Sequence, residues 1–113
     1  MTTPGTAPDP QILDLGHLAR QTFGDADLER EVLGLFEEQC GRLLPVIAGE
    51  GDAAVRADAA HTLKGAARAV GAWRVGEAAD AVEHPLRASG PSPGVEAIAA
   101  LRHAIGQRCG ATA

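Results

Sequence analysis

Three residue types suited to phosphoryl chemistry lie close together in the segment His61-Thr62-Leu63-Lys64-Gly65. A neutral histidine is a nucleophile near pH 7, because its ring titrates in that range. Lys64 lies three residues further on, where its charge would sit beside any group that His61 carries. An exposed glycine within a helix lowers the stability of the helix by about 1 kcal/mol relative to alanine. A glycine at position 65 is therefore expected where another surface must approach the backbone closely. Together they fit a phosphoryl acceptor that docks against a partner.

The arrangement of these residues on a helix follows from its advance of about 100° per residue. We expect one solvent-facing stripe that contains His61, Lys64, Gly65 and Arg68. The opposite face would meet the core through Ala59, Leu63, Ala66 and Val70. From this pattern alone, an alternative remains open: a solvated helix face on which the histidine is incidental.

The elements that must position this stripe are helices, since no segment shows the alternation of a strand. Apolar periodicity predicts them at 10–22, 26–48, 53–70, 73–87 and 93–109. Asp9 and Pro10 supply a cap and a first residue for the first helix, and Ser92 and Pro93 do so for the last. Pro45 should kink the second helix or end it early.

The predicted fold is all-α: an antiparallel four-helix bundle with a short additional N-terminal helix. Residues 1–9 are predicted to be a disordered tail, because they are small, polar and interrupted by Pro and Gly. Residues 10–113 would form the bundle as one domain, since 113 residues suffice for a single core.

Composition excludes several classes of protein. The net charge of −5 argues against nucleic acid, because contact with phosphates needs a basic face. There is no apolar run long enough to span a membrane, and the first basic residue, Arg20, comes too late for a secretory signal. Two cysteines are too few for a zinc site, and His17, His84 and His103 lack helical companions that would make a metal pair. We therefore expect a cytoplasmic protein without a metal site or a cofactor of its own.

The run from His61 to Glu83 resembles the signature of the histidine phosphotransfer (HPt) domain. In that family an apolar residue, a lysine and a glycine follow the histidine at its second, third and fourth positions, with small residues, a glycine and an apolar–Glu pair further on. The corresponding residues here are Leu63, Lys64, Gly65, Ala66, Ala67, Gly71, Val82 and Glu83. The resemblance extends over nearly the whole chain from Pro10.

The resemblance implies a role for each matching residue. His61 would be the phosphoacceptor, Lys64 would stabilise the phosphoryl group, and Glu83 would orient His61 by bonding the ring nitrogen that takes no phosphate. Gly71 would form the turn between the two helices of the motif. Gly65 would admit the partner, a receiver domain. We also assign Arg68 and Ala57 to the surface on which the receiver docks, although Arg68 departs from any fixed choice of the family.

The function implied is that of a phosphocarrier rather than an enzyme. His61 would accept a phosphoryl group from a receiver aspartyl phosphate and pass it to another receiver. The partners would be response-regulator receiver domains, which hold the Mg²⁺, and a hybrid sensor histidine kinase; the protein itself would be a monomer. Two alternatives are kept. One is a helix-turn-helix DNA-binding domain around Gly71, although its second helix would be acidic, and the other is a helical adaptor that is not phosphorylated.

Overall fold

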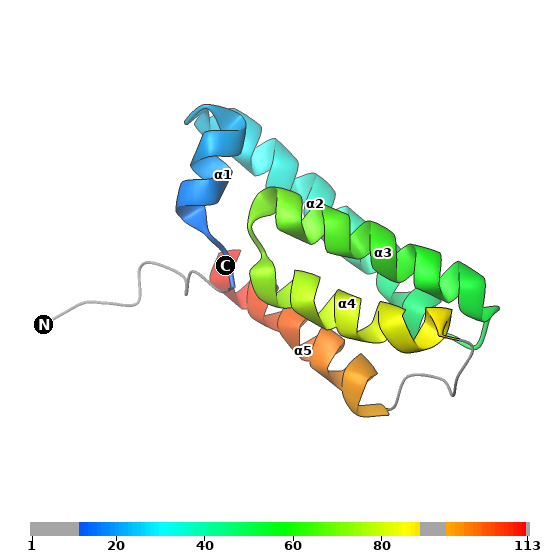
Figure 1. The fold of residues 1–113 in the computed structure, drawn as a ribbon. Helices are drawn as coiled ribbons and strands as arrows, with labels where there is room; N and C mark the ends of the chain where they lie inside the picture. Colours follow the sequence, from blue (N-terminus) through cyan, green and yellow to red (C-terminus); the bar gives the residue numbers. More distant parts are fainter. Residues whose placement is uncertain (1–11, 89–94, 113) are drawn as a thin grey trace, which may run out of the picture.

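The computed structural model describes residues 12–88 and 95–112, and all regular structure in those ranges is helical. The five helices are α1 Leu15–Thr22, α2 Ala26–Ala48, α3 Ala53–Val70, α4 Trp73–Arg87 and α5 Val95–Thr112 (Figure 1). The predicted all-α class is confirmed. The expected tail at 1–9 and the expected cap at Ser92 and Pro93 lie outside the described residues.

The four longer helices form the bundle, and α1 lies across one end of it. Each helix of the bundle packs against the next one in the chain: α2 against α3, α3 against α4, and α4 against α5. A smaller contact between α2 and α5 completes the bundle. The core is aliphatic and rich in alanine, as the scarcity of aromatic residues requires. Its most completely buried members include Leu18, Phe36, Ile47, Leu63, Val75, Val82 and Leu101. Small buried residues on α3 and α4, such as Ala60, Ala67 and Ala79, let these two helices approach closely: a Cβ on Gly76 of α4 would lie 3.8 Å from Cβ of Ala67 on α3.

The bounds of the three middle helices agree with those predicted, but the first and last helices differ. α1 begins at Leu15 rather than at residue 10, because Asp14 is the N-cap: its side chain accepts a hydrogen bond from the His17 backbone N–H. α5 continues to Thr112, past the predicted end at 109. Pro45 does not end α2 early, since the helix runs on to Ala48.

Gly71 forms the turn between α3 and α4, as the resemblance implies. It caps α3 in the left-handed conformation, with φ of 85°. The structure adds a second constraint, because a Cβ on Gly71 would lie 3.0 Å from the backbone oxygen of Asp14. Asp14 is fixed there by two hydrogen bonds: its backbone N–H donates to Gly71 O at 2.9 Å, and its carboxylate accepts from Trp73 Nε1 at 3.0 Å.

Replacing Gly71 by Ala is therefore expected to destabilise the protein by about 1–3 kcal/mol, through left-handed strain and the clash with Asp14. The measurement is a thermal or urea melt. Gly65→Ala is the matched control, because a Cβ at that helical position meets nothing within 4 Å. A melt of Gly71→Ala as stable as that of the parent would contradict this account of the turn.

α3 and α4 run side by side along their lengths in opposite directions (Figure 1). Contacts between them follow a steady antiparallel register: Gly76 lies against Arg68, Asp80 against Lys64, and Glu83 against His61. A helix-turn-helix would cross its two helices at a steep angle and leave the second free for the major groove. The pair is therefore a packed α-hairpin, and the DNA-binding alternative lacks its geometry.

Candidate functional site

His61 lies in the middle of α3, with 63% of its side chain exposed. Its Nδ1 is 3.1 Å from Oε2 of Glu83 on α4. An ionised carboxylate only accepts hydrogen bonds, so Nδ1 must carry the proton in this pair. In the neutral ring the lone pair is then on Nε2, the nitrogen that does not contact Glu83. The structure thus places Glu83 where the resemblance implies an orienting residue.

Glu83 is held between two cations, with only 9% of its side chain exposed. Lys64 Nζ lies 2.7 Å from Oε1, and Arg87 Nε donates to Oε2 at 2.8 Å. Although burial raises the pKa of this carboxyl, hydrogen bonds from Lys64 and Arg87 lower it to about 2, from an ordinary value of 4.5. The resulting contribution to stability is complete above pH 4.5 and is lost as the pH falls toward 2. Glu83 is therefore a permanent anion beside His61 at neutral pH.

Lys64 departs from the predicted solvent-facing stripe, since only 15% of its side chain is exposed. Its Nζ forms an ion pair with Glu83 Oε1 and donates a hydrogen bond to Asp80 Oδ1 at 3.0 Å, and both interactions raise the pKa of the ammonium group. The reason is the close approach of α4, which lays its acidic residues over that side of α3. Lys64 is thus held beside the histidine, but its charge is already shared between two carboxylates.

The three residues assigned to receiver docking have different environments. Gly65 is exposed, and a Cβ there would meet open space. Arg68 is exposed as well, and its stem runs over Gly76 of α4. Ala57 is fully buried, so its assignment to a contact surface is wrong. It belongs to the core cluster of the bundle, a position that a helical wheel of α3 alone does not reveal.

Three polar residues of the site were not among those singled out from the sequence: Asp58, Asp80 and Arg87. Arg87 Nη2 donates to Asp58 Oδ1 at 3.1 Å, which ties the end of α4 to α3. A signal for Arg87 was present, because it follows Glu83 by four residues on one helix, the spacing of a favourable acid–base pair. The sequence does not indicate that Arg87 also reaches Asp58 on α3.

The other histidines are placed apart from this cluster or at its rim. His84 is 78% exposed, with Nε2 3.4 Å from Asp80 Oδ2. His17 packs edge-on against Trp73, and His103 is exposed on α5. A shallow groove between α4 and α5 is lined partly by His103 and does not include His61. Among the side chains that the structure describes, no group of three or more His, Cys, Asp or Glu residues is arranged to hold a metal ion.

In the part of the chain that the structure describes, no helix is both long and apolar enough to cross a membrane. A family model for the Hpt domain matches residues 31–110, which include α3, α4 and most of α5. The match does not include α1 or the start of α2, so the resemblance expected between Pro10 and residue 30 lies outside the matched range. Neither a curated protein nor a solved structure matches the chain significantly. The matched range is well over half of the 113 residues, and the chain belongs to the Hpt domain family, whose members are phosphocarriers of phosphorelays rather than enzymes.

Proposed function

We propose that this protein accepts a phosphoryl group from a receiver aspartyl phosphate on Nε2 of His61 and passes it to the aspartate of another receiver. The observation that carries the proposal is the pairing of Nδ1 with the buried Glu83 carboxylate on a ring that is otherwise exposed. That pairing selects the nucleophilic nitrogen and leaves it accessible. The exposure of Gly65 one turn further on supports docking of a partner over the same face.

The transfer step needs no residue to take up or release a proton. The Nε2 lone pair attacks phosphorus in line, the N–P bond forms, and the P–O bond to the aspartyl oxygen breaks. The aspartate leaves as a carboxylate, and the positive charge that develops on the His61 ring faces the Glu83 anion. Transfer to the next receiver reverses these bond changes.

Lys64 would stabilise the phosphoryl group. Its ammonium group, which is paired with Glu83 and Asp80 in the structure, would also interact with the phosphoryl oxygens. Exclusion of water by a docked receiver strengthens this interaction, because the local dielectric falls. We assign the Mg²⁺ of the transfer to the receiver's own acidic pocket, and no cofactor to this chain. The proposal also includes a hybrid sensor histidine kinase as the source of phosphate, a cytoplasmic location and a monomeric state.

The test is a transfer assay with radiolabelled phosphate. With labelled ATP alone the protein is expected to incorporate nothing, since phosphate should come only through a receiver. With a purified phosphorylated receiver it is expected to gain label that is acid-labile and base-stable, as a phosphohistidine is. A panel of phosphorylated receivers that all leave the folded protein unlabelled would favour the alternative of a helical adaptor.

A further inference from the structure

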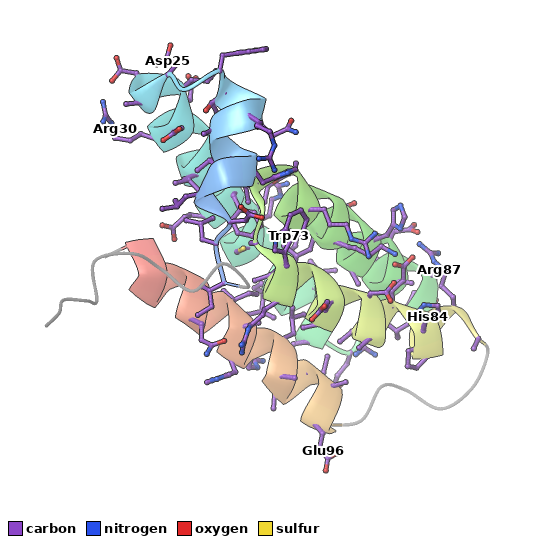
Figure 2. All side chains as sticks on the ribbon, turned by 60° about the vertical axis from the view of Figure 1, so that its left-hand side comes forward. Asp25, Arg30, Trp73, His84, Arg87 and Glu96 are labelled. Atoms are coloured by element: carbon purple, nitrogen blue, oxygen red, sulfur yellow. The ribbon has the colours of Figure 1, made fainter. Side chains whose placement is uncertain are left out.

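Arg87 connects the two helices that form the site, at the end of α4 remote from Trp73 (Figure 2). Its Nε donates to Glu83 Oε2 at 2.8 Å, and its Nη2 donates to Asp58 Oδ1 at 3.1 Å. Asp58 is on α3, three residues before His61 and thus one turn away. A single guanidinium is therefore bonded to an acidic residue of each helix.

The Glu83 oxygen that Arg87 holds is also the one that contacts His61. Oε2 accepts from Arg87 Nε at 2.8 Å and lies 3.1 Å from His61 Nδ1. A carboxylate at the end of a flexible side chain rotates freely unless its oxygens are held. The rigid, planar fork of an arginine can fix such an oxygen in direction as well as distance. Lys64 Nζ lies 2.7 Å from the other oxygen, Oε1.

We propose that Arg87, anchored by Asp58, is a positioning residue for phosphotransfer: it holds Glu83 Oε2 on His61 Nδ1 and thereby fixes the ring tautomer that exposes Nε2. This inference rests on the proposed function of His61. Arg87 acts through Glu83 and touches no reacting atom. The cation also makes Glu83 a weaker base, so that the Nδ1 proton stays on the ring as the N–P bond forms.

The first test is phosphorylation by phosphoramidate, a small donor that needs no docked receiver. His61 Nε2 forms an N–P bond as the P–N bond of the donor breaks. The donor nitrogen already carries three protons, so it leaves as ammonia. Arg87→Met is expected to slow this uptake about tenfold, because a charge-assisted hydrogen bond that orients the ring is lost. Asp58→Asn should slow it less, and Arg87→Lys should fall between Arg87→Met and the parent, since an ammonium lacks the fork.

Arg30→Met is the matched control for the loss of a surface arginine. Arg30 pairs with Asp27 three residues earlier on α2, and both side chains are largely exposed. Figure 2 places Arg30 at the opposite end of the molecule from Arg87. This control variant is expected to take up phosphate at the parent's rate.

The second test is a spectroscopic signature that a purely structural role would not move. Nitrogen-15 spectra of the histidine rings should show His61 with its proton on Nδ1 in the parent, and a larger share of the other tautomer in Arg87→Met and Asp58→Asn. In the double variant, uptake should be no slower than in Arg87→Met alone, because Asp58 acts only through Arg87.

Two results would overturn the inference. One is an unchanged His61 tautomer in folded Arg87→Met or Asp58→Asn, whatever the uptake rate. The other is an unchanged uptake rate in Arg87→Met. If Arg87→Met does not fold, Asp58→Asn and Arg87→Lys decide the question by the same two measurements. A parent protein that takes up no phosphate would contradict the proposed function instead, while its tautomer would still report on the role of Arg87.

Discussion

His61→Gln is expected to abolish phosphoryl uptake from any donor while leaving helix content and melting temperature close to those of the parent. The loss should be complete because the lone pair of an amide nitrogen is delocalised into the carbonyl group and cannot attack phosphorus. The variant therefore lacks a nucleophile at this position. The fold should persist because the His61 side chain is 63% exposed. A glutamine amide can still donate to Glu83, so that carboxylate keeps a neutral partner as well as its two cations.

The measurement is acid-labile label after incubation with a phosphorylated receiver, paired with circular dichroism on the same sample. His84→Gln is the matched control, because His84 is also an exposed histidine with a carboxylate, that of Asp80, beside its ring. It is expected to retain uptake. Label that persists at His84 or His103 in the His61→Gln protein would show that another histidine is the acceptor.

Gly65→Gln is expected to melt at the same temperature as the parent or higher, and yet to lose most of its transfer from a receiver. Stability should rise by up to about 1 kcal/mol, because glutamine is a better helix former and the structure leaves room for a Cβ. Transfer should fall because the new side chain stands one turn from His61, on the face over which a receiver must close. The two effects have opposite signs, so a loss of folding cannot explain the loss of transfer.

Gly106→Gln provides the matched glycine replacement. Gly106 is exposed in α5, a Cβ there also meets nothing within 4 Å, and α5 makes no contact with α3 in the described residues. Both variants should gain stability, but only Gly65→Gln should lose transfer from the receiver. Phosphorylation by phosphoramidate should survive in both, since it needs no docking. Normal transfer from a receiver to folded Gly65→Gln would show that the docking surface lies elsewhere.

The features that depend on neighbours along the chain could be predicted before the fold was known. The bounds of α2, α3 and α4 follow from apolar periodicity and from the turn at Gly71. In the structure Asp25 caps α2 by accepting from the backbone N–H groups of Asp27 and Leu28, and Asp52 caps α3 by accepting from that of Ala54, so local side chains also mark where these helices begin. The candidacy of His61 followed from its spacing to Lys64 and Gly65 within a single helix. Such signals act within a few residues, so they can be read before the packing is known.

The resemblance implied the pairing of His61 with Glu83, but the other contacts that build the site across α3 and α4 depend on tertiary packing. The sequence predicts an exposed Lys64 and an Ala57 available to a partner. In the structure Lys64 is covered by Asp80 and Glu83 of α4, and Ala57 is buried in the core. Asp14, which caps α1 through a local hydrogen bond to His17, is also held by a distant one to Gly71. The bridge from Arg87 to Asp58 joins residues far apart in the sequence. The register between two packed helices sets these contacts, and that register is fixed by the fit of many side chains rather than by any local pattern.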